Sequence, residues 1–401
     1  MDLLSDRIKK IAGGISAEVI SFRRHLHQNP ELSFKEFKTS EFIAQTLLNK
    51  KIEIEYIKEG IAQTGLVAYI KGKNPGKKMI ALRADMDALP IIEQNVIDYK
   101  SINEGVMHAC GHDVHSSSLL GTAIILNELK DQFEGTIKLV FQPGEELIPG
   151  GASLMIKAGI LKEKSLKSMF GQHVAPQIEV GKVGFRSGIY MASADEIYLT
   201  VKGKGGHAAM PDNAVDPVLI TAHIIIALQQ VVSRNANPKI PTVLSFGKVI
   251  AEGATNIIPN EVKVAGTFRT LNEEWRSEAK KRITKIATGI AESMGGTCDV
   301  NILDGYPYLE NNPLLTDRAK VYAKEFLGEE NVVDLDIWMA SEDFAYYTHH
   351  VDSCFYRLGV RNETLGITSG VHTPTFNVDE KALEVGSGLM AWLALKELEI
   401  K

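Results

Sequence analysis

The chain has few cysteines, no long apolar run and no concentration of basic residues. Its three cysteines, Cys110, Cys298 and Cys354, are an odd number and lie too far apart for a disulfide framework. No stretch approaches the roughly 18 uninterrupted apolar residues of a membrane span. Acidic Asp2 and Asp6 stand where a signal peptide carries positive charge. We therefore expect a reduced, cytoplasmic protein with no membrane partner.

The charge balance argues against a nucleic-acid surface. The net charge is −6 at pH 7, and no basic run is present to neutralise phosphates. The hydrophobic content of 44% and the charged content of 23% are ordinary for a globular protein. Because 401 residues are many for a single core, we expect two domains.

The first part of the chain alternates helical and strand-like patterns, which favours an α/β domain with a mostly parallel sheet covered by helices. The predicted helices cover residues 15–27, a stretch starting near Phe34, and 114–129. The predicted strands cover residues 64–70, 78–84, 135–141 and 168–172, the last of them short.

The pattern changes near residue 190 and predicts a second kind of domain. Its order is β-α-β-β-α-β, the split, ferredoxin-like arrangement. The elements expected are residues 196–201, 214–232, 242–249, 261–270, 272–294 and 298–303. We therefore predict an inserted domain over 188–304, between two parts of one catalytic domain, 1–187 and 305–401.

The segment Cys110-Gly111-His112 places a thiolate and an imidazole on either side of a glycine. Gly111 has no side chain to obstruct them and tolerates backbone angles that let both ligands converge. Sulfur beside imidazole suits zinc or a similar transition metal. A buried cysteine next to a histidine is also common as simple packing. The pair therefore needs partners from elsewhere in the chain.

Polar residues follow three of the predicted strands. Asp85 and Asp87 follow the second strand, Glu145 and Glu146 the third, and His173 the fourth. In open α/β sheets, ligands bind beyond the carboxyl ends of the strands. We expect all three groups on one rim, together with the loop that carries Cys110 and His112.

The adjacent carboxylates of Glu145 and Glu146 can serve one site only if their strand has already ended, because neighbours in a strand point to opposite faces. Pro143-Gly144 ends it. One carboxylate can then bind a metal while the other accepts a proton from the activated water. Asp87 could hold a ligand in place, and Asp85 could do the same or cap the next turn. The alternative is two solvated charges on a loop.

Eight motifs occur in order and resemble those of one enzyme family. They are RADMDALP (83–90), MHACGHDVH (107–115), FQPGEE (141–146), GQHVAP (171–176), GKGGHAAMP (203–211), NIIPNEV (256–262), SEDF (341–344) and SGVHTPTF (369–376). The chain is similar to the metallopeptidase and aminoacylase family with hippurate hydrolase, bacterial N-acyl-amino-acid amidohydrolases and plant auxin-conjugate hydrolases. The likeness covers essentially the whole chain, including RRHLHQNPELSFKE near the N-terminus.

The resemblance implies a zinc-peptidase-like catalytic domain whose site binds two divalent metal ions (Zn, Mn, Co or Ni). Glu145 is implied as the general base and acid, with Asp87 as the catalytic aspartate. Asp85 stands where the aminopeptidase-like branch has a metal-binding histidine. A cysteine stands where the wider family has a bridging carboxylate. The implied metal ligands are Cys110, His112, Glu146, His173 and His372.

The inserted domain is implied to contribute to catalysis as well. In the family, a histidine like His207 reaches across a dimer, or across the closed cleft, to polarise the scissile carbonyl. Its glycine-rich surroundings alone favour a loop histidine without a role. Asn256 and Arg269 are similar to residues near the substrate's amide oxygen and carboxylate, and arginine suits a carboxylate because its planar fork donates two parallel bonds. His115 could support the metal site or lie on a helix surface.

These observations predict a metal-dependent amidohydrolase of N-acyl-L-amino acids, acting as a homodimer or higher oligomer through the inserted domain. Substrates resembling hippurate or N-acetyl amino acids remain open, as do carboxypeptidase or dipeptidase activity and N-acetyl-diaminopimelate deacetylation. Two other classes stay as alternatives. One is a cysteine hydrolase with Cys110 as nucleophile; the other is a non-catalytic metal-dependent binding protein.

Overall fold

The computed structural model describes residues 3–56 and 62–399. It separates into two compact units. Unit 1 comprises Met1–Tyr190, Glu310–Ile337 and Asp343–Lys401, and unit 2 comprises Met191–Leu309 with Trp338–Glu342. Unit 2 ends later than the predicted insert of 188–304 and takes in a short segment from further along the chain.

Unit 1 is built on an eight-stranded mixed sheet with the order β1-β2-β4-β3-β5-β16-β6-β15. The pairs β4–β3, β3–β5, β5–β16 and β6–β15 are parallel, while β1–β2, β2–β4 and β16–β6 are antiparallel. A separate two-stranded sheet joins β7 (Gly188–Met191) and β14 (Leu309–Asn311). The large sheet consists of β1 (Glu53–Tyr56), β2 (Leu66–Lys71), β3 (Met79–Asp85), β4 (Thr136–Gln142), β5 (Leu166–Glu179), β6 (Val183–Phe185), β15 (Val332–Asp334) and β16 (Asp352–Arg361).

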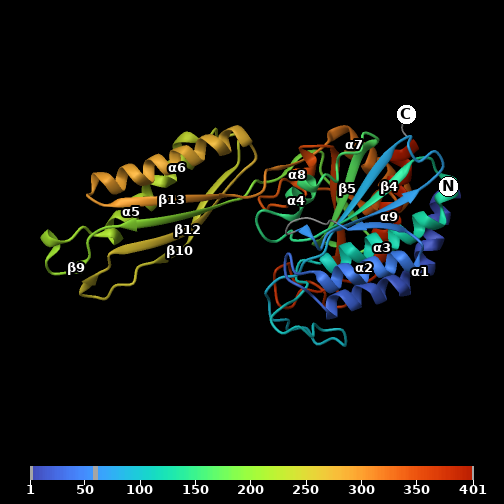
Figure 1. The fold of residues 1–401 in the computed structure, drawn as a ribbon, viewed down its shortest axis with the longest axis horizontal. Helices are drawn as coiled ribbons and strands as arrows, with labels where there is room; N and C mark the ends of the chain where they lie inside the picture. The colour runs from blue at the N-terminus through green and yellow to red at the C-terminus, as the bar shows by residue number, and fades with distance from the viewer. Residues whose placement is uncertain (1–2, 57–61, 400–401) are drawn as a thin grey trace. The chain divides into compact units, whose positions relative to one another are not determined.

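Helices cover this sheet, as the alternating pattern predicted (Figure 1). Three long helices, α1, α3 and α9, pack against one another, and α3 and α9 also contact β3. The bounds in unit 1 are α1 (Leu3–Gln28), α2 (Phe37–Asn49), α3 (His112–Glu128), α4 (Gly151–Ala158), α7 (Pro313–Leu327), α8 (Ala345–Thr348) and α9 (Ala382–Glu399).

The central strands β3 and β4 are buried along their whole length, as expected for strands covered on both sides. Three local predictions were wrong. Helix α1 begins at Leu3, twelve residues before the expected start at residue 15. The strand expected over 168–172 runs on to Glu179, so His173 lies within β5 and does not follow it. Helix α3 begins at His112, two residues earlier than expected, because Gly111 precedes it in a left-handed conformation.

Unit 2 has a four-stranded antiparallel sheet with the order β10-β12-β8-β13, the ferredoxin-like arrangement predicted (Figure 1). Helices α5 and α6 pack on each other and on the sheet. A small pair, β9 (Gly206–His207) and β11 (Ile257–Ile258), lies outside it. The main elements are β8 (Asp195–Lys202), α5 (Pro217–Gln230), β10 (Thr242–Ile250), β12 (Glu261–Thr270), α6 (Glu273–Ser293) and β13 (Thr297–Asp304).

Helix α5 is unusually apolar for a helix that is only partly covered. Asp216 caps it by accepting from the Val218 and Leu219 amides. The stretch Pro217–Asn235 reaches a mean hydropathy of 1.3, enough by length and composition for a membrane span, and 33% of it is buried. Ile220 and Ile224 pack into the core of unit 2, while Val218, Leu219 and Ile226 are exposed.

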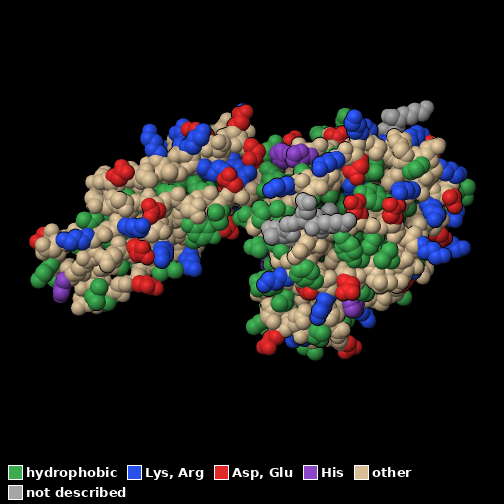
Figure 2. All heavy atoms as spheres, in the orientation of Figure 1, with side chains coloured by type: hydrophobic (Ala, Val, Ile, Leu, Met, Phe, Trp, Pro, Cys, Tyr) green, Lys and Arg blue, Asp and Glu red, His purple; other side chains and the backbone are tan. Residues whose placement is uncertain are grey.

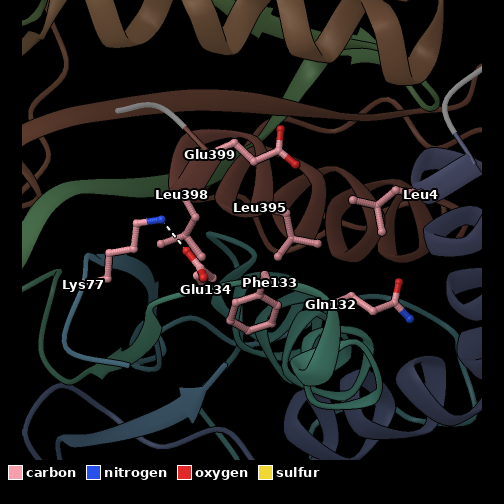
Figure 3. A pocket seen from close by; sticks show the side chains of 8 residues that line it. All are labelled: Leu4, Lys77, Gln132, Phe133, Glu134, Leu395, Leu398 and Glu399. Carbon is pink, nitrogen blue, oxygen red and sulfur yellow. Dashed lines mark hydrogen bonds and ion pairs between the residues drawn. The ribbon is translucent and has the colours of Figure 1, made fainter. Parts of the chain in front are cut away.

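The surface carries both signs of charge. On the face drawn in Figure 2, lysine and arginine side chains alternate with acidic ones over both units. Unit 1 also has a cavity of about 270 Å³ beside the ends of α1 and α9 (Figure 3). Leu4, Phe133 and Leu395 line it, and a Lys77–Glu134 ion pair lies at its edge. None of the predicted site residues lines this cavity.

Candidate metal centre

The predicted ligands of unit 1 converge, although they come from four separate segments. Two groups of potential ligand atoms share the Cys110 thiol, and within each group all the atoms lie within 4.8 Å of one another. One adds His112 and His173, and the other adds Glu146 and His372. The structure therefore brings all five predicted ligands around one cysteine.

Two of these histidines are held so that Nε2 is left for a metal. His112 Nδ1 lies 3.1 Å from Asp87 Oδ1, and His173 Nδ1 lies 2.8 Å from the Val174 carbonyl oxygen. Because both partners are acceptors, each Nδ1 carries the proton. His173 Nε2 then faces the Cys110 sulfur at 3.4 Å. His112 Nε2 is buried and has no hydrogen-bond partner among the described residues.

The backbone around the cysteine is as unusual as its side chains. Gly111 has φ of +84°, and a Cβ there would lie 2.6 Å from a methyl group of Val174. Only glycine fits, as the motif predicted. His372 also adopts positive φ (+60°), and its amide donates to the Ala109 carbonyl at 2.7 Å. This bond ties the loop of His372 to the loop of Cys110.

The turn after β4 brings both adjacent glutamates to the site. Strand β4 ends at Gln142, and Gly144 follows with φ of +59°. Glu145, Glu146 and His112 form another group of potential ligand atoms within 4.8 Å. The Glu146 amide donates to Asp87 Oδ2 at 3.0 Å. The paired-carboxylate prediction therefore holds as geometry, and the alternative of two solvated charges is wrong.

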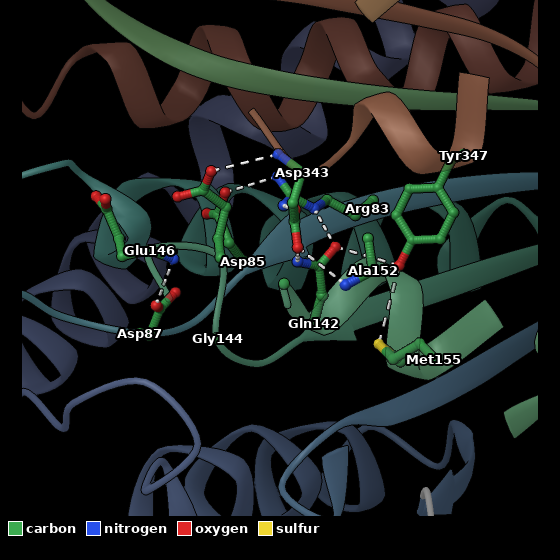
Figure 4. Close-up of polar contacts among 12 residues, drawn as sticks. Arg83, Asp85, Asp87, Gln142, Gly144, Glu146, Ala152, Met155, Asp343 and Tyr347 are labelled. Atoms are coloured by element: carbon green, nitrogen blue, oxygen red, sulfur yellow. Dashed lines mark hydrogen bonds and ion pairs between the residues drawn. The ribbon is translucent and has the colours of Figure 1, made fainter. Parts of the chain in front are cut away.

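Beneath this turn lies a buried polar network that sequence reasoning missed (Figure 4). The Arg83 guanidinium donates to Asp85 (2.6 Å), Gln142 (2.9 Å) and Asp343 (2.8 Å). Asp343 in turn accepts from the Gln142 side chain, and its amide lies 3.4 Å from Glu145 Oε1. The available signal was an arginine inside an otherwise apolar strand, since such a residue is rarely buried without partners.

His115 and Asp85 form hydrogen bonds within the protein that support the site. His115 is fully buried, so the alternative of a helix-surface histidine is wrong. Its Nε2 accepts from the Val174 amide at 2.9 Å, which leaves Nδ1–H to donate to Asp85 at 2.5 Å. Both ring nitrogens are therefore used within the protein.

In unit 2, the predicted substrate residues fall into two places. Backbone pairing of Ile257 with His207, and a bond from the Ala208 amide to the Asn256 carbonyl, bring His207 and Asn256 together. Arg269 lies near the far end of β12, where it donates to the Met339 carbonyl at 3.1 Å.

The spacing along β12 separates these two places. The loop of His207 is tied to Asn260, the residue just before the strand, by bonds from the Gly203 and Gly205 amides. From the start of β12 to Arg269 the strand spans roughly 26 Å at about 3.3 Å per residue. One copy of unit 2 therefore does not bring Arg269 and His207 to the same small molecule.

Comparison with known proteins places the chain. The profile of peptidase family M20/M25/M40 matches residues 81–396. The chain is a member of this family. It is 39% identical over 399 residues to thermostable carboxypeptidase 2 of Saccharolobus solfataricus, covering 99% of each chain. It is 38% identical over 381 residues to an N-acetylcysteine deacetylase of Bacillus subtilis, covering 95% of this chain and 97% of that one.

The solved structures agree with the M20 assignment. A dinuclear metal-binding peptidase of the M20 family from Bacillus subtilis superposes with a TM-score of 0.81 at 34% identity. The match covers 96% of this chain and 99% of the other. It confirms the predicted fold class, a mostly parallel sheet with an inserted antiparallel domain.

The residues of this M20 protein fit a pair of metal ions. The fit rests on three features: the buried His112 Nε2, which has no hydrogen-bond partner among the described residues, the His173 Nε2 directed at sulfur, and a cysteine common to two ligand groups. Thiolate, imidazole and carboxylate are a donor set for zinc and similar transition metals. Cys110, His112, His173, Glu146 and His372 would hold the ions.

Two of the candidate ligands in the M20 site, Cys110 and His112, have raised pKa values. Burial and nearby carboxylates hold the pKa of the Cys110 thiol well above its usual value. Burial lowers the pKa of His112, but Asp85 and Asp87 outweigh it and raise the pKa to about 10. Burial holds the pKa of His173 well below its usual value. At neutral pH, Cys110 and His112 carry protons that metal binding must displace.

Metal affinity is therefore expected to rise with pH. Between pH 6 and 8, the pH is below the pKa values of Cys110 and His112, so both groups are protonated before metal binds. Because each released proton makes the affinity rise about tenfold per pH unit, the release of two gives a rise of up to about 100-fold per pH unit. Titration calorimetry of the metal-free protein in two buffers of different protonation enthalpy counts the released protons. Affinity that stays flat across this range would contradict the assigned protonation states.

Proposed function

We propose that this M20 enzyme hydrolyses the amide bond of N-acyl-L-amino acids, releasing a carboxylic acid and a free amino acid. The alternatives within the same chemistry are carboxypeptidase or dipeptidase action on short peptides and deacetylation of N-acetyl-diaminopimelate. Relatives named as carboxypeptidases and as an N-acetylcysteine deacetylase match it at similar identity, so resemblance alone does not choose between them.

One observation carries the proposal: two potential ligand groups share Cys110, and Glu145, which forms a further group with His112 and Glu146, lies beside them. Glu145 Oε2 is 4.0 Å from the His112 Nε2 that faces the site. A carboxylate at this position can reach a water molecule between the groups. A protein that only bound metal would not require this second carboxylate.

Glu145 is assigned as general base and acid. Divalent ions, when bound, would lower the pKa of the attacking water and polarise the scissile carbonyl. Glu145 accepts the water's proton as the oxygen attacks the carbonyl carbon, and delivers it to the amine nitrogen as the C–N bond breaks. The Asp343 amide and the bond from Glu146 to Asp87 hold the turn in place meanwhile.

Arg269 is assigned to the substrate's carboxylate. Its side chain is half-buried, and its hydrogen-bond partners are the Met339 carbonyl at 3.1 Å and the Ser341 hydroxyl at 3.4 Å, neither of which is charged. Burial alone lowers its pKa. A planar guanidinium in this state suits a free carboxylate through two parallel bonds.

His207 and Asn256 are assigned to the amide oxygen in the site of a second copy of the chain. The separation along β12 supports this assignment, because Arg269 and His207 of one chain cannot contact one small substrate. The edge strand β10 and helix α5 support pairing through unit 2, since Ile250 and Ile226 are exposed there. The cytoplasmic location stays a prediction.

A cysteine hydrolase is the rival with a specific observation in its favour, the Cys110–His173 distance of 3.4 Å. Reactive cysteines have a lowered pKa and lie in electropositive surroundings. Here burial and the neighbouring carboxylates raise the pKa of the thiol instead. The pair therefore suits metal binding better than nucleophilic attack.

Replacing Glu145 with alanine is expected to lower kcat by about 10²- to 10⁴-fold, because the proton acceptor is lost. Metal content, measured by elemental analysis, should stay at the wild-type level. Glu146→Ala is the matched control, since it changes the neighbouring carboxylate and should lose metal. A Glu145→Ala enzyme with substantial activity would remove Glu145 from the base role.

The substrate class is tested with a panel that varies the acyl group and the amino acid separately. Zn, Mn and Co are each added to the metal-free protein, and short peptides with a free carboxylate serve as comparison. N-acyl amino acids are expected to give the higher kcat/KM, and chelation is expected to abolish turnover. Activity that survives complete chelation would favour the cysteine hydrolase.

Mixed dimers test whether His207 acts in the partner's site. His207→Ala and Glu145→Ala are each expected to be nearly inactive. When the two variants are produced together, one site of each mixed dimer has both intact residues. Turnover should return to at most about one quarter of wild type with random pairing. A mixture as inactive as its components would place His207 in its own chain's site, whereas a His207→Ala enzyme with wild-type activity would place it outside catalysis.

A further inference from the structure

The turn that carries Glu145 and Glu146 is held from outside the sheet by a segment between α1 and α2, residues 31–36. The Glu31 carbonyl accepts from the Ala88 amide at 2.8 Å, so the segment runs beside the end of β3. Ser33 donates to Asp87 at 2.6 Å. The segment therefore contacts the residue that orients His112.

Glu36 makes the central contact of this segment. Its side chain is fully buried, and its Oε1 accepts from the Gly144 amide at 2.8 Å and from the Phe34 amide at 2.9 Å. Its Oε2 accepts from the Thr64 hydroxyl at 2.8 Å. One carboxylate thus joins the catalytic turn to two other parts of unit 1.

The Phe34 ring closes the turn from the same side. Phe34 adopts φ of +63°, an uncommon conformation for a non-glycine residue. A Cβ on Gly144 would lie 2.3 Å from this ring. Ring and carboxylate together leave Gly144 little freedom, and Gly144 is the residue directly before Glu145.

Helix capping does not explain Glu36. The residue occupies the N-cap position of α2, yet its side chain makes no cap bond there. The Glu31 carboxylate accepts from the Thr39 amide at 2.8 Å and so satisfies that helix start. The two acidic residues therefore have different contacts: Glu31 caps the helix, and Glu36 accepts a hydrogen bond from Gly144.

The position is also unfavourable for a charge. Burial and the nearby Asp87 raise the pKa of Glu36 to about 7, although its hydrogen bonds lower it. A carboxyl group kept under such conditions points to a requirement for its geometry. An amide could meet that requirement, because its oxygen accepts the same two backbone bonds.

We propose that Glu36 is a positioning residue that fixes the Gly144 turn and thereby the directions of Glu145 and Glu146. It acts through the turn and touches neither substrate nor metal. The assignment rests on the proposed function for its effect on turnover. Its effect on metal binding, through Glu146, does not depend on which substrate is used.

Three variants and one control test it. Glu36→Ala should lower kcat about 10- to 100-fold with KM within about twofold, and should weaken metal binding by a similar factor. Glu36→Gln should stay within about threefold of wild type in both. Glu31→Ala, from the same segment, is the control and should change metal affinity by less than about twofold.

Glu36→Asp decides the matter if the alanine variant does not fold. It keeps the charge but is one methylene too short to reach both backbone amides, and a kcat loss of about tenfold in a folded protein is expected. Wild-type kcat and metal affinity in Glu36→Ala or Glu36→Asp would overturn the proposal. So would equal losses in Glu36→Ala and Glu31→Ala, or a glutamine variant as poor as alanine.

Metal titration separates the two levels of inference. If wild-type protein turns over no N-acyl amino acid, the proposed function fails. The metal affinities of the Glu36 variants, measured by competition with a chelating dye, still test the positioning role. If the wild type is active and the Glu36 variants equal it in kcat and in metal affinity, only the positioning role fails.

Discussion

The arrangement of the site depends on the hydrogen bonds that the buried Arg83 guanidinium donates. This side chain is fully buried and bonds to Asp85 at the end of β3, Gln142 at the end of β4, and Asp343 from a distant part of the chain. A buried charge is stable only when it is paired and hydrogen-bonded on all sides. The network therefore requires the end of β3, the end of β4 and the segment with Asp343 to meet in one arrangement. That arrangement fixes where β4 ends and therefore where Glu145 lies.

Around this network, the site residues are held from behind by hydrogen bonds. Asp87 orients His112, the Val174 carbonyl orients His173, and the Ala109 carbonyl ties down the loop of His372. Such contacts choose the tautomer and direction of each ligand. The same principle extends outward to Glu36, which holds a backbone amide and not a ligand.

Much of the site followed from local chemistry and one topological rule. The carboxyl ends of parallel strands meet at one edge, so Asp87, Glu145 and the Cys110 loop could be placed together. The positive φ at Gly111 and the turn at Gly144 followed from glycine's freedom. Arg83 and Asp343 could not be paired in advance, because 260 residues separate them. The extension of β5 past His173 was missed as well, since its pairing partner β16 comes much later in the chain.

The resemblance to a known family supplied the full set of candidate metal ligands, and the sequence by itself determined the fold class, the order of the elements in the insert and the Cys110–His112 and Glu145–Glu146 pairs. These depend on periodicity, glycine positions and side-chain chemistry, which are local properties. Only the tertiary structure decided that Cys110 is common to two ligand groups, that His115 forms its hydrogen bonds within the protein, and that Arg269 lies far from His207 along β12. Those facts depend on which distant segments pack together and in what register, and no local pattern encodes that.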